Sequence, residues 1–299
     1  MPNLPSPPNF PSSPNAQSVN IVKNLEHSLS VFKLVVIGDN ALFERALRDI
    51  AASLSSPFLF LAKPFQLDDH FNASLACNYE WVLFYNDKKA LTLSHLHHKT
   101  LQNFYLDYAD NTFLLRLKQA APAVELLLKA LGKRASALTI LDATLGFGRD
   151  SLVLASYCQK VIGLERHPLV YCLVQNAVER ARFNGDLKPL ISKVSFYQAD
   201  SLSWMQSNKK HEVDVVYCDP MFPERQKSAL VKKNMQILHA LLCEEEPFFD
   251  EGILLEAARN FARKSVVVKR PLHAKPLGEQ KPSHAILGKD ARYDVYRAL

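Results

Sequence analysis

The stretch Leu141-Asp-Ala-Thr-Leu-Gly-Phe-Gly-Arg-Asp150 decides the fold class, because an apolar strand pattern turns here into a helix pattern through two glycines. In parallel sheets, ligands bind outside the carboxyl ends of the strands, and glycines there let a ligand approach the backbone. Gly146 and Gly148 supply a G-x-G pattern, but Ser151 stands where a dinucleotide-binding motif has its third glycine. The pattern therefore predicts a cofactor-binding turn, with an ordinary tight turn as the alternative.

Two acidic residues, Asp142 and Asp150, flank this turn. Carboxylates are poor neighbours for a pyrophosphate but good ones for a cationic ligand. S-adenosylmethionine carries a sulfonium and an ammonium. The flanking acids therefore favour S-adenosylmethionine over a nicotinamide dinucleotide as the cofactor.

From residue 138 to residue 299, strand and helix patterns alternate regularly. Near-continuous apolar strands between helices are typical of a parallel sheet that is covered on both faces. We therefore expect an α/β fold with a doubly wound, mostly parallel sheet and a terminal antiparallel hairpin. The expected strands are 138–141, 160–164, 194–198, 213–218 and 265–269, the hairpin is 284–287 with 293–296, and the helices are 150–157, 168–183, 227–242, 253–262 and a short one from 201.

The N-terminal part has a different character. Residues 1–20 are rich in proline and serine and have little to bury, so we expect a disordered tail. Residues 21–110 predict a small α/β subdomain, with a helix over 41–54 and strands at 31–38, 57–62, 81–85 and 90–93. A connecting helix is expected over 111–137.

The composition excludes several classes of protein. Hydrophobic residues make up 48% of the chain and charged residues 22%, which is typical of a globular protein. No apolar run is long enough to span a membrane, and no secretory signal pattern opens the chain. The five cysteines are scattered and form no CxxC pair, so we expect a reducing, cytoplasmic location without disulfides or bound metal. The His95-Leu-His97-His98 group fits surface histidines better than a metal site.

The positive charge is concentrated late in the chain. Residues 259–299 hold ten Lys and Arg against three acidic residues, whereas the whole chain has a net charge of only +6. A basic face of this kind suits an anionic partner such as RNA, although it could also be an ordinary solvated surface. The candidate phosphate-binding residues are Lys227, Lys232, Lys233, Lys269 and Arg270.

Acidic residues also follow the second and third strands of the expected sheet. Glu165 ends the second strand 17 residues after Gly148, where a carboxylate can accept hydrogen bonds from both hydroxyls of a ribose. Asp200 and Ser201 follow the third strand, in a position suited to the amino group of an adenine.

The fourth strand leads directly into Asp219-Pro-Met-Phe-Pro223. An exocyclic amine on a nucleobase is a poor nucleophile, because its lone pair is delocalised into the ring. Two hydrogen-bond acceptors, such as the Asp219 carboxylate and the Pro220 carbonyl, would localise that lone pair. Phe222 could stack on a base that has been turned out of its helix. The alternative is a strand-end turn made rigid by two prolines.

These motifs resemble the small-subunit rRNA methyltransferase J family, which is named 16S rRNA (guanine(1516)-N2)-methyltransferase. The similarity covers roughly residues 125–297, and its most specific part is the long block that begins with the Asp219 motif. The stretches that carry it are Asp142–Asp150, Leu164-Glu-Arg-His-Pro168, Asp219–Lys233, Val266-Val-Val-Lys-Arg-Pro271 and Arg292-Tyr-Asp-Val-Tyr296.

The resemblance implies a class I, Rossmann-like methyltransferase fold, S-adenosylmethionine as cofactor, and 16S rRNA or the 30S subunit as partner. It also implies cofactor contacts from Arg149, Asp150, Glu165, Arg166 and Asp219. The sequence departs from the family pattern in two places. Asp200-Ser201 replaces a pair that is often Ser-Ser, and residues 114–123 lack the glycines of a basic loop and keep only Arg116 and Lys118.

Three alternatives remain open at this point. The same chemistry could act on another exocyclic amine, in DNA adenine or a protein amide. A nicotinamide-dependent dehydrogenase is disfavoured by Ser151. The third alternative is a catalytically inactive RNA-binding module.

Overall fold

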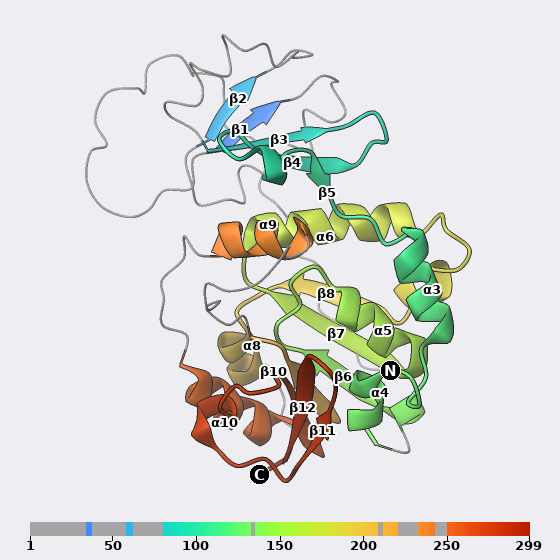
Figure 1. Ribbon diagram of the computed structural model, residues 1–299, viewed down its shortest axis with the longest axis vertical. Helices are drawn as coiled ribbons and strands as arrows, with labels where there is room; N and C mark the ends of the chain where they lie inside the picture. The colour runs from blue at the N-terminus through green and yellow to red at the C-terminus, as the bar shows by residue number, and fades with distance from the viewer. Residues whose placement is uncertain are drawn as a thin grey trace, which may run out of the picture. The chain divides into compact units, whose positions relative to one another are not determined.

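The computed structural model describes residues 34–37, 58–61, 80–132, 135–208, 212–220, 233–242 and 250–299 (Figure 1). The expected N-terminal tail (1–20) and the helix expected over 41–54 lie outside these residues, as do Phe222, Lys227 and Lys232.

A seven-stranded sheet forms the larger part of the described chain. Its strands lie in the order β11-β12-β10-β9-β6-β7-β8, and only the pairings of β12 with β10 and β11 are antiparallel. This confirms the predicted doubly wound sheet with a terminal antiparallel pair. The strands are β6 (Thr139–Asp142), β7 (Lys160–Glu165), β8 (Val194–Gln198), β9 (Val215–Cys218), β10 (Ser265–Pro271), β11 (His284–Leu287) and β12 (Ala291–Arg297).

The order of the strands determines where a ligand can bind. The chain moves outward from β6 to β7 and β8, then returns to the other side of β6 with β9 and β10. Asp142 at the end of β6 pairs with Gly163 in β7 and with Tyr217 in β9. The carboxyl ends of these three strands therefore share one edge, and the switch point between β6 and β9 lies at its centre.

Two hydrophobic clusters cover the two faces of this sheet. One contains apolar residues of α5 (Arg149–Tyr157), α6 (Pro168–Ala181) and α9 (Lys233–Leu242). The other contains residues of α8 (Ser201–Ser207) and α10 (Glu251–Phe261). A short helix α7 (Lys188–Ile191), which the sequence did not predict, packs beside α5. None of the helices that the structure describes is both long and apolar enough to cross a lipid bilayer.

A second sheet of five strands lies earlier in the chain, in the order β2-β1-β3-β4-β5. Strand β1 pairs in parallel with β2 and β3, and the other pairings are antiparallel. Its strands are β1 (Leu34–Ile37), β2 (Phe58–Leu61), β3 (Trp81–Tyr85), β4 (Leu91–His95) and β5 (Phe104–Tyr105), with a 3-10 turn η1 (Lys99–Leu101) before β5.

Packing continues from this small sheet into the larger one. Trp81 and Leu93 belong to the same hydrophobic cluster as the helices α5 and α6. The backbone N–H of Leu91 also donates to Oδ1 of Asn176 in α6, at 2.9 Å. The hydrophobic core therefore crosses the subdomain boundary that the sequence predicts near residue 110.

The prediction of one connecting helix over 111–137 is wrong. The structure has α3 (Asn111–Gln119), α4 (Leu126–Ala130) and a 3-10 turn η2 (Ala135–Ala137) in this stretch. Helix α3 ends at Ala120, which has extended dihedral angles, two residues before Pro122. Proline lacks a backbone N–H and disfavours helical geometry in the residue before it, so it ends the helix despite the apolar periodicity.

Candidate active site

The glycine turn after β6 has the geometry that the sequence pattern indicates. Gly146 and Gly148 have φ angles of +51° and +67°, in the left-handed region that glycine adopts without strain. A Cβ on Gly148 would lie 2.9 Å from the hydroxyl oxygen of Tyr108. That hydroxyl donates to the carbonyl of Phe147 inside the turn, at 2.9 Å. The turn is therefore fixed both by its own dihedral angles and by the segment that precedes α3.

Gly148→Ala is expected to lower the free energy of unfolding by about 1–3 kcal/mol, because it adds left-handed strain and a contact with Tyr108. Denaturant unfolding would measure the difference. Gly185→Ala is the matched control, since an added Cβ meets nothing within 4 Å there. Equal stabilities of Gly148→Ala and the wild type would contradict this role of the turn.

Asp142 is the buried acid at the centre of the edge, with 1% of its surface exposed. Its carboxylate accepts from the backbone N–H of Thr144 at 3.2 Å and from the hydroxyl of Ser151 at 2.6 Å. Burial raises the pKa of Asp142 to about 7. Ser151, which breaks the dinucleotide-binding pattern, thus provides a hydrogen bond that a third glycine could not.

Glu165 lies at the end of β7 and is also buried. Its two carboxylate oxygens accept from the backbone N–H groups of Gly146 and His167, each at 2.8 Å. Burial raises the pKa of Glu165 to about 7. A carboxylate oxygen has a second lone pair, so both oxygens can still accept from the hydroxyls of a ribose. Glu165 therefore ties the glycine turn to the start of α6 and remains suited to the predicted contact.

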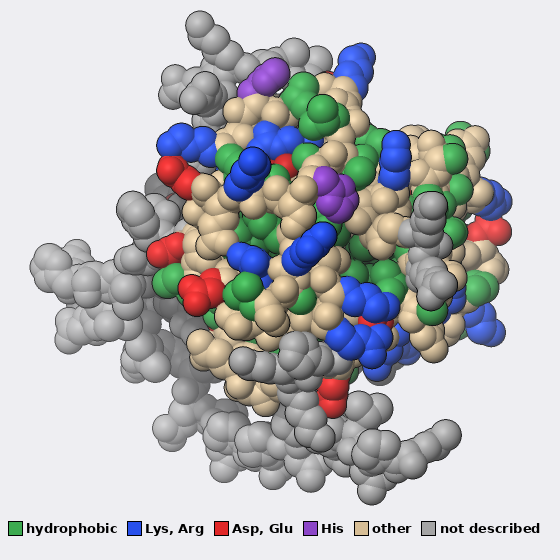
Figure 2. Space-filling view, turned by 90° about the horizontal axis from the view of Figure 1, so that it is seen from below, with side chains coloured by type: hydrophobic (Ala, Val, Ile, Leu, Met, Phe, Trp, Pro, Cys, Tyr) green, Lys and Arg blue, Asp and Glu red, His purple; other side chains and the backbone are tan. Residues whose placement is uncertain are grey.

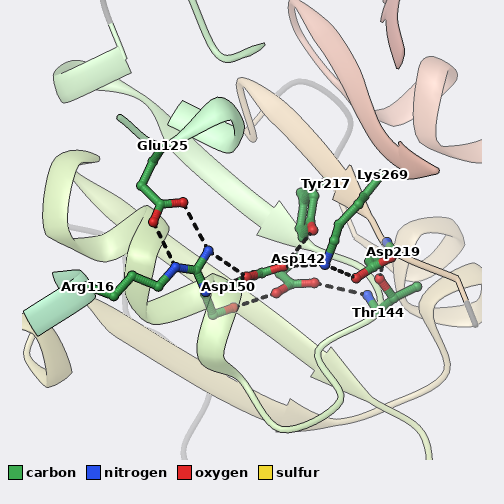
Figure 3. Close-up of polar contacts among 9 residues, drawn as sticks. Arg116, Glu125, Asp142, Thr144, Asp150, Tyr217, Asp219 and Lys269 are labelled. Carbon is green, nitrogen blue, oxygen red and sulfur yellow. Dashed lines mark hydrogen bonds and ion pairs between the residues drawn. The ribbon is translucent and has the colours of Figure 1, made fainter. Parts of the chain in front are cut away.

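Lys269 joins two of the acidic residues (Figure 3). Its Nζ lies 2.7 Å from Oδ2 of Asp219 and 3.1 Å from Oδ2 of Asp150. The hydroxyl of Tyr217 donates to the same Asp150 oxygen at 2.9 Å. Although burial acts to raise it, the attraction of Lys269 and Arg116 lowers the pKa of Asp150. Asp150 is therefore held as an anion beside Asp219.

Helix α3 adds a second cation to this network. The guanidinium of Arg116 lies 3.4 Å from Oδ1 of Asp150 and forms a two-pronged pair with Glu125, at 2.7 and 3.0 Å (Figure 3). The segment that departs from the family pattern thus contributes a charged side chain to the edge of the sheet.

The backbone of Asp219 is fixed to the glycine turn. Its N–H donates to Oγ1 of Thr144 at 2.6 Å. The Asp219 side chain is 36% exposed. No described residue donates a hydrogen bond to its Oδ1. Pro220, the second predicted acceptor, follows directly and is buried.

Three other predicted cofactor residues, Arg149, Asp200 and Ser201, make contacts within the protein. The guanidinium of Arg149 pairs with Asp110 at 2.7 Å and lies over the ring of Phe113. Asp200 caps α8 by accepting from the backbone N–H of Ser203, and Ser201 donates to the carbonyl of Ala143. These contacts do not bring Arg149 to the acidic network. Arg166 is exposed beside Glu165.

Two of the predicted phosphate-binding residues require correction. Arg270 is only 3% exposed, because its guanidinium pairs with Glu251 and donates to the carbonyl of Lys275. It cannot lie on an RNA-binding surface. Lys269 is occupied by Asp150 and Asp219 within the candidate site. For Lys233 only the backbone is described, at the first position of α9.

Four residues of this site were not predicted from the sequence, namely Thr144, Ser151, Tyr217 and Arg116. Thr144 and Ser151 lie within the glycine motif, so their positions there were a usable signal. Tyr217 sits on an apolar strand, and Arg116 lies 34 residues before its partner Asp150. No local pattern identifies these two.

The residues at this edge fit S-adenosylmethionine. Four carboxylates, those of Asp142, Asp150, Glu165 and Asp219, lie at or beside the ends of β6, β7 and β9. Lys269 and Arg116 neutralise them only in part, since Arg116 is shared with Glu125. An acidic edge beside a glycine turn suits a ligand with two positive centres. Among the described residues, no cluster of histidine, cysteine or acidic side chains could hold a metal ion.

Comparison with known proteins agrees with this chemistry. A family model described as "Putative SAM-dependent methyltransferase" matches residues 66–298. A crystal structure of a SAM-dependent methyltransferase from Neisseria gonorrhoeae superposes with a TM-score of 0.62 at 28% identity, over 89% of this chain and 96% of that one. The fold and the site therefore define a class I methyltransferase that uses S-adenosylmethionine.

Two relatives show to which family of methyltransferases the chain belongs. Ribosomal RNA small subunit methyltransferase J of Marinobacter nauticus is 33% identical over 281 residues, which cover 92% of this chain and 96% of that protein. The enzyme of the same name from Thioalkalivibrio sulfidiphilus is 41% identical over 192 residues, 64% of this chain and 72% of that protein. The chain belongs to the ribosomal RNA small subunit methyltransferase J family.

Proposed function

We propose that this chain transfers a methyl group from S-adenosylmethionine to the N2 amine of a guanosine in 16S rRNA, in the cytoplasm, with position 1516 as the expected target. The observation that carries the proposal is the placement of Asp219. Its backbone is fixed to the glycine turn, one carboxylate oxygen is held by Lys269, and the other accepts from no residue that the structure describes. The relatives' names supply the substrate class.

Asp219 and Pro220 would prepare the amine for attack. The Oδ1 atom of Asp219 and the carbonyl oxygen of Pro220 each accept one N–H of the substrate, which localises the nitrogen lone pair. S-adenosylmethionine supplies a methyl group bonded to a positively charged sulfur. The N–C bond would form as the C–S bond of the bound cofactor breaks, and the methylated amine would then release a proton to solvent.

The target base must leave its stack to reach these acceptors. Enzymes that modify bases commonly turn the base out and hold it against an aromatic side chain. Phe222 follows Pro220 by two residues and is the aromatic residue of this motif. We assign it the stacking role as part of the proposal.

A surface for RNA phosphates is also required. Lys281, Lys289 and Arg297 are exposed in the C-terminal part of the chain. Figure 2 shows Lys and Arg side chains spread over one face, with fewer Asp and Glu among them. The exposed residues named above, with Lys227, Lys232 and Lys233 of the Asp219 block, are the proposed phosphate-binding residues in place of Lys269 and Arg270.

Replacing Lys232 and Lys233 together by glutamine is expected to weaken RNA binding and to reduce the slope of log affinity against log salt by roughly one to two. Fluorescence anisotropy with labelled 16S rRNA fragments at several salt concentrations would measure the slope. Lys160→Gln, a change of an exposed lysine at the amino end of β7, is the control. An unchanged slope in the double variant would show that these lysines do not contact phosphates.

Methyl transfer to a panel of substrates tests the proposal. Labelled S-adenosylmethionine would be offered with 30S subunits, with naked 16S rRNA and with DNA. Transfer to either ribosomal substrate but not to DNA supports the proposal. Transfer to DNA alone would favour the alternative amine substrate, and no transfer at all would favour an inactive RNA-binding module.

A further inference from the structure

Lys269 has no part in the chemistry assigned so far, although it lies between the two acids nearest to that chemistry. Its side chain is 30% exposed, and its partners Asp150 and Asp219 are 19% and 36% exposed. An ion pair on an open surface contributes little, but this ammonium contacts two carboxylates from different elements in a partly buried place. The arrangement links α5, β9 and β10 at the switch point of the sheet.

We propose that Lys269 is a positioning residue for Asp219: its ammonium keeps the Asp219 carboxylate ionised and holds Oδ2, so that Oδ1 faces the substrate amine. This inference rests on the proposed function for the role of Asp219. The geometry behind it is the pair of contacts from Nζ, at 2.7 Å to Asp219 and 3.1 Å to Asp150.

The charges around Asp219 explain why a cation is needed there. The carboxylates of Asp150 in α5 and Asp142 in β6 both repel the negative charge of Asp219. Arg116 of α3 pairs with Glu125 and Asp150. Arg270 pairs with Glu251 and also lowers the pKa of Asp219, but less than Lys269 does. Asp150 and Asp219 also act on the hydroxyls of Tyr217 and Tyr293, and their negative charges raise the pKa of both tyrosines. Lys269 is therefore the cation that contacts Asp219 directly among the described residues.

Removing the ammonium would leave two carboxylates beside one another. Burial raises the pKa of the Asp219 carboxyl, and the attraction to Lys269 opposes that rise. Without Lys269, Asp219 would bind a proton at higher pH, and a protonated carboxyl donates where the amine needs an acceptor. An opposite charge at this distance shifts a pKa by about one to three units.

The first test is the pH dependence of single-turnover methyl transfer to 30S subunits. Lys269→Met is expected to move the acid-side midpoint upward by at least about one pH unit. At pH values below the shifted midpoint, the rate of Lys269→Met would be about tenfold or more lower than that of the wild type. The two rates would approach each other as the pH rises. Asp142 and Glu165 titrate in the wild type and in Lys269→Met alike. Only the difference in midpoint between these two proteins is therefore attributed to Lys269. A loss that is equal at every pH would overturn the proposal.

The second test uses stability and needs no RNA. In the wild type, the attraction of Lys269 lowers the pKa of its partner carboxyls relative to Lys269→Met. Its stabilisation is therefore present above those pKa values and is lost as the pH falls through them. The pKa of Asp150 is lowered, so the pH dependence comes mainly from Asp219, and the difference in Tm between wild type and Lys269→Met is expected to be larger at pH 8 than at pH 4. A pH-independent difference would mean that the side chain acts only by packing, which contradicts the proposal.

Two further variants complete the design. Lys269→Arg retains the charge and is expected to keep the wild-type midpoint within about half a pH unit. Asp150→Asn in the Lys269→Met background removes the nearest like charge and is expected to move the midpoint back toward the wild type. Lys160→Met, at the opposite edge of the sheet, should change neither profile. If Lys269→Arg and the double variant both behave like Lys269→Met, the electrostatic role is excluded. An inactive wild type with the expected Tm profile would overturn the proposed function and leave the charge coupling established.

Discussion

Asp219→Asn is expected to lower the single-turnover rate of methyl transfer by about 10²–10³-fold or more, the usual cost of losing one preorganised electrostatic contact. The structure explains why so small a change should matter. Lys269 donates to Oδ2, so an asparagine places its amide oxygen there and turns its NH₂ toward the substrate amine. Two donors would then face one another. If the asparagine amide is turned the other way, its NH₂ faces the Lys269 ammonium, and two donors again face one another.

The rate would be measured with saturating S-adenosylmethionine on 30S subunits, and folding would be checked by thermal unfolding. Asp186→Asn is the matched control, since Asp186 is 51% exposed and, among the described residues, forms an ion pair only with Lys118. Its rate should equal that of the wild type. A wild-type rate in Asp219→Asn would exclude the carboxylate as the acceptor for the amine.

Glu165→Ala is expected to weaken S-adenosylmethionine binding by about 2–3 kcal/mol, which is about 30- to 160-fold. The protein would lose the contacts of this carboxylate to the ribose hydroxyls and also its link between Gly146 in the glycine turn and His167 at the start of α6. Isothermal titration calorimetry would measure the dissociation constant. Glu256→Ala, on the exposed side of α10, is the control.

The same carboxylate predicts a pH dependence of cofactor binding. Because burial raises the pKa of Glu165 to about 7, the acceptor form is gained as the pH rises through neutrality. Affinity should therefore be lower at pH 6 than at pH 8. Glu165→Gln should lose the part of this dependence that Glu165 provides and keep the part from Asp142, whose pKa is also about 7. Unchanged affinity in a folded Glu165→Ala protein would refute the assignment.

The elements of the large sheet follow from local patterns in the sequence. Apolar runs that end in Asp142, Glu165 and Asp219 predicted both the strands and the acidic edge, since parallel strands bring their carboxyl ends together. The glycine turn was visible for the same reason, because its position between a strand and a helix is local information. Here the spacing along the chain determines the arrangement in space.

The errors arise where a contact depends on distant parts of the chain. Lys269 and Arg270 are neighbours on a strand, so their side chains point to opposite faces. The sequence shows two adjacent positive charges. It does not show that Lys269 pairs with Asp150 and Arg270 with Glu251. The break in the connecting helix was recoverable, because Pro122 is a local signal that the apolar periodicity obscured.

The most direct test is the identity of the methylated nucleoside. 30S subunits from a strain that lacks the gene for this chain would be incubated with the wild-type protein and S-adenosylmethionine. The rRNA would then be digested to nucleosides for mass spectrometry. We expect one N2-methylguanosine gained per subunit, and none with Asp219→Asn on the same timescale. A methyl group on any other atom, or no gain from the wild-type protein, would contradict guanosine N2 methylation as its function.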